Sequence, residues 1–187
     1  MPARLSRATF GRPTLAVARR LLGCVLWHRT GDVWLRGRIV EVEAYLGNGD
    51  LASHAANGKR TPRNGIMFGP AGFAYVYFSY GMHHCFNVVT ESDGQAGAVL
   101  IRGLDGIERA AGPGLTCRAL NLSLRDNGRD LVTDSDLWIA TGRPRRHERV
   151  VQATRIGIRK SVDLPYRFYI LDSPGVSRRD RTAESRL

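Results

Sequence analysis

Cysteine is scarce in this chain, and the few cysteines form no recognisable pattern. Cys24, Cys85 and Cys117 are odd in number, lie far apart and include no Cys-x-x-Cys pair. Small secreted scaffolds and structural zinc sites depend on closely spaced cysteines, so neither class is indicated. We therefore expect a protein of the reducing cytoplasm.

Long apolar runs are missing as well. No stretch approaches the roughly 20 apolar residues that a membrane span needs, and residues 1–10 lack the apolar core of a signal peptide. Internal repeats, low-complexity segments and long linkers are also absent. The 187 residues thus predict one domain, 1–187, without a membrane partner and with flexible ends at 1–10 and 181–187.

Acidic residues are in short supply. The chain has 17 of them against 28 basic residues, which gives a formal net charge of +11. Such an excess favours an anionic partner, and nucleic acid is the leading one. The alternative is that the charge only keeps the protein soluble.

Recognisable cofactor and metal motifs are not found. There is no glycine-rich phosphate loop and no Gly-x-Ser-x-Gly elbow. His83 and His84 are adjacent and point to opposite faces of a strand, and His28, His54 and His147 lack ligand spacing. We predict no metal and no cofactor, which leaves hydrolysis as the simplest chemistry.

Strand patterns dominate the rest of the sequence. Residues 14–22 predict a short amphipathic helix between a proline and a glycine, and residues 106–122 predict short helical segments around Gly112-Pro113-Gly114. Strands or hairpins are expected at 25–27 with 33–45, at 73–90 with a tip near Tyr80, and at 98–102, 136–140, 150–155 and 167–171. This order predicts an α+β fold: a single mixed domain with a largely antiparallel sheet, flanking short helices and a protruding hairpin.

One predicted strand, residues 38–45, carries a possible catalytic group. Period-two geometry puts Glu41, Glu43 and Tyr45 on one face, with neighbours roughly 7 Å apart. Hydrolysis of a glycosidic bond needs a general base, and a nucleobase needs an aromatic ring to stack on. Taken alone, a strand glutamate opposite an arginine is more often a solvated ion pair.

The second hairpin is rich in tyrosine. Phe73, Tyr75 and Tyr77 share one face, whereas Tyr80 lies at the turn. Tyr77 could line a pocket, and Tyr80 could fill the gap that an extruded base leaves in a duplex. Ordinary sheet core is the alternative for Tyr75 and Tyr77.

Three further polar residues are candidates. Asn87 and Arg102 lie within apolar strands and would need partners if buried. Arg102 beside Glu43 would keep that carboxylate ionised and could hold a water molecule, or it could form a purely structural ion pair. His54 lies in a polar loop with Lys59, Arg60 and Arg63, and this loop could cover a site or be plain surface.

Taken together, these segments resemble the alkyladenine (3-methyladenine) DNA glycosylases over residues 11–178. The segments that carry the resemblance are 36–47, 52–55, 61–64, 67–69, 75–77, 80–82, 87–89, 98–102, 112–114 and 167–170. The resemblance implies a monofunctional enzyme of base-excision repair that flips damaged purines from double-stranded DNA. It implies substrates such as 3-methyladenine and 7-methylguanine, with deaminated purines as a possible extension.

The resemblance also assigns roles to individual residues. Glu43 would be the general base, and Arg102 with the backbone at Ile156 would hold the attacking water. Tyr45 would stack on one side of the extruded purine, and His54 with Tyr77 on the other.

Three further roles follow from the same match. His54 would read the base edge, Asn87 would exclude the exocyclic amine of normal guanine, and Tyr80 would intercalate into the DNA. No lysine or terminal amine is placed for a Schiff base, so no lyase step is expected. One flipped base needs one subunit, so a monomer is expected.

The chain departs from many relatives in two places. Leu115 follows Gly114 where they carry lysine, and the linker 102–112 is short. A phosphate contact is therefore missing, which Arg109, Arg118 and the cluster at 143–149 could replace. Two rival functions remain at this point: a non-catalytic nucleic-acid-binding module and a hydrolase of free nucleosides.

Overall fold

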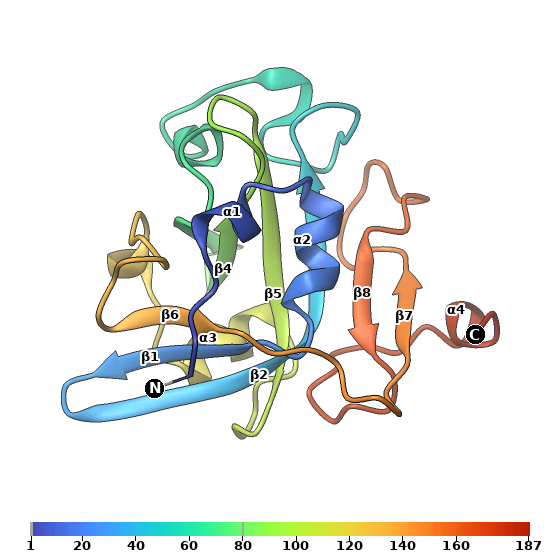
Figure 1. Ribbon diagram of the computed structural model, residues 1–187. Coiled ribbons are helices and arrows are strands. Elements are labelled where there is room, and N and C mark those ends of the chain that lie inside the picture. Colours follow the sequence, from blue (N-terminus) through green and yellow to red (C-terminus); the bar gives the residue numbers. More distant parts are fainter. Residues whose placement is uncertain (1, 80) are drawn as a thin grey trace.

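A computed structural model describes residues 2–79 and 81–187 of the protein. In Figure 1, short helices pack on a curled sheet of eight strands, which confirms the predicted α+β class. The strands are β1 (Val25–Thr30), β2 (Val33–Leu46), β3 (Ala74–Ser79), β4 (His83–Val89), β5 (Gly97–Asp105), β6 (Leu137–Ala140), β7 (Val150–Ala153) and β8 (Arg167–Ile170). Their order is β3-β4-β5-β2-β1-β6, β8 pairs with β2 and β7, and the pairings are antiparallel.

Strand β2 organises the sheet because it pairs with three others. Its first half forms a hairpin with β1, from Thr30 opposite Val33 to Val25 opposite Arg38. Its second half pairs with β5 and with β8. The register with β5 shifts on both sides of Glu41, which marks an irregularity of the β-bulge kind. Bulges bend a strand and change the direction of its side chains. This irregularity lies two residues before Glu43, the predicted general base.

The helices are short. Two of them fall within the predicted helical segments 14–22 and 106–122, whereas those at 7–10 and 181–184 were not predicted. They are α1 (Arg7–Phe10), α2 (Thr14–Leu21), α3 (Pro113–Ala119) and α4 (Arg181–Glu184), with 3-10 turns at Ala56–Gly58, Gly65–Phe68 and Leu124–Asp126. Helix α2 buries Val17, Ala18 and Leu21 and packs against β2 and β5. The chain turns after it at Gly23, whose φ of +81° favours glycine, and where a Cβ would lie 2.2 Å from the Arg143 carbonyl carbon.

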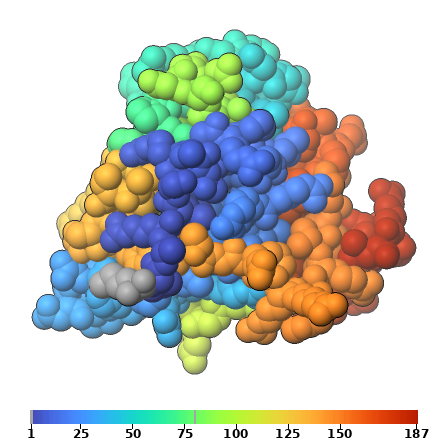
Figure 2. Space-filling model, in the orientation of Figure 1, coloured from blue at the N-terminus to red at the C-terminus, as the bar shows by residue number. Residues whose placement is uncertain are grey.

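Residues 2–10 belong to the segment that the sequence predicts to be flexible, and two of them reach the core. Leu5 and Phe10 are buried in the main core, and Arg4 forms a β-bridge with Ala140. Figure 2 shows this N-terminal segment lying across the middle of one face of the molecule. Burial of these apolar side chains favours packing of the segment on the core. Flexibility of residues 1–10 stays a prediction.

At the other end, residues 181–184 form α4, and Glu184 accepts a hydrogen bond of 2.8 Å from the Tyr169 hydroxyl. Flexibility of residues 181–187 stays a prediction. Among residues 2–79 and 81–187, no helix combines the length and apolar character needed to cross a membrane.

Candidate active site

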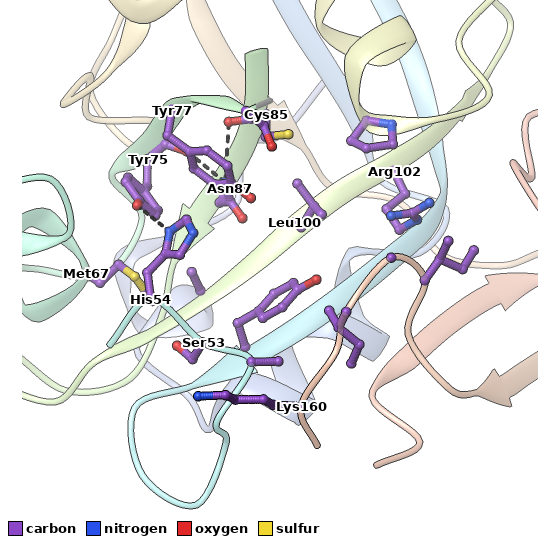
Figure 3. Close-up of a pocket in the computed structure, with 18 of the residues that line it drawn as sticks. Ser53, His54, Met67, Tyr75, Tyr77, Cys85, Asn87, Leu100, Arg102 and Lys160 are labelled. Atoms are coloured by element: carbon purple, nitrogen blue, oxygen red, sulfur yellow. Dashed lines mark hydrogen bonds between the residues drawn. The ribbon is translucent and has the colours of Figure 1, made fainter. Parts of the chain in front are cut away.

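A pocket of about 640 Å³ opens at the side of the sheet formed by β3, β4 and β5. This volume lies within the range of sites for small molecules or single nucleobases. Loops near residues 51–54 and 156–160 form its other walls. Six residues singled out from the sequence line it: Tyr45, His54, Tyr77, Asn87, Arg102 and Ile156. Figure 3 shows His54, Tyr77, Asn87 and Arg102 around the hollow.

Glu43 lies immediately behind this lining and is fully buried. Its Oε1 accepts a hydrogen bond of 2.7 Å from the Ile156 N–H, and its Oε2 accepts one of 2.8 Å from the Tyr45 hydroxyl. Nη1 of Arg102 lies 3.4 Å from the same Oε2. The three partners of the carboxylate are therefore themselves residues of the pocket wall.

The environment of Glu43 sets its proton affinity. Burial raises the pKa of the carboxyl group, while Arg102, the Ile156 N–H and the Tyr45 hydroxyl lower it, and the balance remains above the ordinary value. A carboxylate with a raised pKa is a stronger base than one in water. This suits Glu43 to take a proton from a water molecule.

Arg102 is held loosely compared with the other buried arginines. Its contacts are long: 3.4 Å to Glu43, 3.6 Å to Glu41 and 3.3 Å to the Ser177 hydroxyl. Its Nε has no hydrogen-bond partner among residues 2–79 and 81–187 although it is buried. An arginine with unused donors in a pocket wall can bind a water molecule or an anion.

Glu41, which the sequence places on the same face as Glu43, has a different environment. It accepts a hydrogen bond of 2.9 Å from Arg167 and one of 2.7 Å from the Ser177 N–H. Its charge is thus neutralised by a partner outside the pocket lining. Glu41 serves to hold Arg102 and Arg167 in place, and Glu43 is the carboxylate that contacts the pocket wall.

Sequence reasoning missed Ser177, which reaches the site from far along the chain. The segment that carries it crosses β5 so closely that a Cβ on Gly103 would lie 2.1 Å from the Gly175 carbonyl oxygen. Only glycine permits this approach. The pair of glycines, 72 positions apart, was the one available signal, and it has no meaning before the fold is known.

The aromatic wall joins two parts of the chain. The rings of His54 and Tyr77 lie 4.6 Å apart at 68°, and Nδ1 of His54 lies 2.8 Å from the Tyr75 hydroxyl. Burial and the nearby Arg63 both lower the pKa of His54, so its ring is neutral at pH 7. A neutral imidazole has one donor and one acceptor nitrogen, which can read the edge of a base.

Asn87 is fixed in orientation at the back of the pocket. Its Nδ2 donates to the carbonyl oxygens of Tyr75 at 3.0 Å and Cys85 at 3.4 Å, as the dashed lines in Figure 3 show. Only 3% of the residue is exposed. An amide held in this way presents one defined polar edge to whatever fills the pocket.

The predicted intercalating residue, Tyr80, lies outside the described residues. Strands β3 and β4 precede and follow it in the sequence, and Phe78 and Met82, each two positions away along the chain, are 44% and 69% exposed. Leu115 is also exposed, and a Cβ on the neighbouring Gly114 would come within 3.0 Å of His83, the first residue of β4, at the turn end of this hairpin. The apolar side chain of Leu115 cannot make the phosphate contact of a lysine at this position.

An aromatic pocket backed by a buried carboxylate and an arginine is the arrangement expected of enzymes that act on a nucleobase taken out of its stack. Comparison with known proteins specifies the class. The family model described as methylpurine-DNA glycosylase matches residues 8–174 of the chain. The chain therefore belongs to the methylpurine-DNA glycosylase family and is a DNA glycosylase.

Individual relatives agree with the family. The chain is 43% identical to a protein of Alkaliphilus oremlandii over 94% of the chain and all of that protein. It is 44% identical to one of Carboxydothermus hydrogenoformans, with 94% and 99% covered, and 48% identical to one of Koribacter versatilis, with 94% and 93% covered. Each of the three carries the provisional name 3-methyladenine DNA glycosylase.

Proposed function

We propose that this glycosylase flips alkylated purines, such as 3-methyladenine and 7-methylguanine, out of double-stranded DNA and hydrolyses their N-glycosidic bond. The observation that supports it most is the buried Glu43, bonded to three residues of an aromatic pocket. The names of the relatives point to the same substrate class. The proposed range extends to deaminated purines such as hypoxanthine.

In the proposed binding mode, the extruded base enters the pocket between aromatic rings. Tyr45 would stack on one side of the base, and His54 with Tyr77 on the other; all three residues line the pocket. Electron-rich rings attract a cationic base more strongly than a neutral one, which favours alkylated purines. Asn87 would exclude the exocyclic amine of guanine, and Tyr80 would occupy the space left in the duplex.

The proposed reaction needs only water and the residues of this chain. A water molecule held by Arg102, Glu43 and the backbone at Ile156 attacks C1′ of the sugar while the bond from C1′ to the base breaks. Glu43 accepts the proton of the water, and the electron pair of the broken bond neutralises the departing cationic base. The products are the free purine and an abasic site.

The proposal includes a monomeric enzyme that acts in the cytoplasm. One flipped base needs one subunit, so we take a monomer as the working unit. Cys24, Cys85 and Cys117 are free and buried, which is compatible with action in the cytoplasm.

The test uses duplex DNA that carries 3-methyladenine, or separately hypoxanthine, with EDTA present and abasic sites scored after alkali. Wild type should release the alkylated base, and Glu43→Gln should be slower by a factor on the order of 10²–10⁴, the usual contribution of a general base. Release of both bases defines a broad pocket, and release of 3-methyladenine alone a narrow one. Equal activity of Glu43→Gln would overturn the mechanism. DNA binding without release by either protein would replace it with a binding module.

A further inference from the structure

Arg155 and Asp50 form a buried ion pair next to the pocket, although neither residue lines it. Nη1 of Arg155 donates to Oδ2 of Asp50 at 2.6 Å, and Nη2 donates to Oδ1 at 2.7 Å. The two side chains are 0% and 1% exposed. Two parallel charge-assisted hydrogen bonds hold a guanidinium in a fixed orientation as well as a fixed position.

The Asp50 side of the pair organises the turn that leads to His54. Its Oδ2 accepts from the Leu46 N–H and its Oδ1 from the Ala52 N–H, both at 3.1 Å. Its carbonyl oxygen accepts from the Ser53 N–H at 3.1 Å. The carboxylate therefore ties the end of β2 to the loop that positions the aromatic wall.

The Arg155 side of the pair braces the catalytic strand. Nη1 also donates to the Ala44 carbonyl oxygen at 2.9 Å. The guanidinium lies 4.7 Å from the centre of the Tyr45 ring and 5.4 Å from that of Tyr166. The next residue, Ile156, donates its N–H to Glu43. Arg155 thus sits between the stacking ring and the backbone group that contacts the carboxylate.

We propose that the ion pair of Arg155 and Asp50 is a positioning element that holds the Tyr45 ring, the His54 loop and the Ile156 N–H in register with Glu43. The inference rests on the proposed function of the same site. A buried ion pair is often no more stabilising than apolar residues of the same volume. The ion pair of Arg155 and Asp50 is present here because it orients three separate segments around the carboxylate of Glu43.

Two single variants test the inference, and each introduces a side chain of similar size to the one it replaces. Arg155→Lys keeps the charge but cannot form two parallel bonds or lie flat on a ring. Asp50→Asn removes the opposite charge. The matched control is Arg129→Lys, because Arg129 forms a similar two-bond pair with Asp134, at 2.6 and 2.8 Å, and does not line the pocket.

The measurement is base release in single turnover, with excess enzyme, across a range of pH and below the melting temperature of every variant. Both site variants should lose on the order of 10²-fold in the rate constant, as misplaced catalytic groups do. Since the Ile156 N–H lowers the pKa of Glu43 against the effect of burial, its displacement should move the acid limb of the profile to higher pH. The concentration of DNA at half saturation and the behaviour of Arg129→Lys should stay as in wild type. The double variant should lose little beyond the worse single one.

Other outcomes separate this inference from the proposed function. If wild type releases base, and Arg155→Lys and Asp50→Asn match it in rate and pH profile, the positioning role is wrong and the function stands. If wild type releases no base, the function itself fails. If Arg155→Lys does not fold, Tyr166→Leu replaces it, since Tyr166 is half-buried and is the second ring against the guanidinium. An unchanged pH profile in Tyr166→Leu and Asp50→Asn would then contradict the inference.

Discussion

The hydroxyl of Tyr45 donates a hydrogen bond of 2.8 Å to Oε2 of Glu43. The ring proposed to stack on the base is therefore joined to the proposed general base. Burial of the Tyr45 hydroxyl and the charge of Glu43 both raise the pKa of Tyr45, so the hydroxyl keeps its proton and acts as a donor. One side chain thus provides the proposed stacking surface and also lowers the pKa of Glu43.

Tyr45→Phe tests this relationship. The variant keeps the ring but loses the bond that lowers the pKa of Glu43, which burial already raises. We expect the acid limb of the pH-rate profile to move to higher pH, while DNA binding remains as in wild type. The matched control is Tyr169→Phe, which removes a 2.8 Å hydrogen bond to Glu184 away from the pocket. A profile that coincides with that of wild type would show that the hydroxyl does not tune Glu43.

Glu43→Gln should make the protein more stable while it slows the release of the base. The folded-state pKa of Glu43 is raised by burial, so the folded protein binds its proton more tightly than the unfolded chain does. Stability from this group is present below the unfolded pKa and is lost as pH rises through the folded pKa. At neutral pH, the melting temperature of the variant should exceed that of wild type by about 2–4 °C for each kcal/mol gained in the free energy of unfolding. The gap should shrink in acid, and a constant gap would argue against a shifted pKa.

Acid stability should depend on Asp134, remote from the pocket lining. Burial tends to raise its pKa, but hydrogen bonds from Arg129 and from the N–H groups of Asp136 and Leu137 lower it to about 2. Because the pKa of Asp134 is lower in the folded protein than in the unfolded chain, its carboxylate stabilises the fold at pH values above the unfolded-state pKa. This stabilisation is lost as the pH falls through about 2. Arg129→Leu should cost about 2 kcal/mol near neutral pH, with the cost fading in acid. Urea unfolding at several pH values measures it, and a cost independent of pH would point to lost packing instead.

DNA binding should weaken steeply with salt. The chain carries a formal net charge of +11, and each phosphate contact releases a counterion. Between 50 and 200 mM salt we expect affinity for duplex DNA to fall by about tenfold or more if several phosphates are contacted. Titration of a fluorescent duplex at several salt concentrations gives the slope. A flat response would exclude a binding mode based on phosphate contacts.

Leu115 offers a direct test of whether a phosphate lies within reach of this position. The residue is 39% exposed, and its neighbour Gly114 lies against His83 at the turn end of the hairpin of β3 and β4. Leu115→Lys should tighten DNA binding and steepen the salt dependence by roughly one counterion. Leu115→Gln controls for the loss of the apolar side chain. If affinity for DNA depends on salt concentration with the same slope in both variants, no phosphate lies within reach of this position.

The local pattern of the sequence determined the elements and the faces of the strands. Period-two spacing placed Glu41, Glu43 and Tyr45 together, and the structure brings the two carboxylates to one guanidinium, that of Arg102. Helix α2 follows from apolar spacing between a proline and a glycine, and it ends one residue before the predicted boundary. These features depend on neighbouring residues alone, so a sequence reveals them. The roles of Ile156 and Asn87, by contrast, came from a family resemblance.

Tertiary structure alone decided which residues meet. Ile156 reaches Glu43 across 113 positions of the chain, and Arg155 reaches Asp50 across 105. No local pattern distinguishes Arg155 from the many other arginines, because its importance comes from burial against Asp50 and Tyr45. Strand order, the irregular register at Glu41 and the crossing at Gly103 bring these groups together. Contacts of this kind depend on the packing of the whole sheet, so residue spacing along the chain carries no record of them.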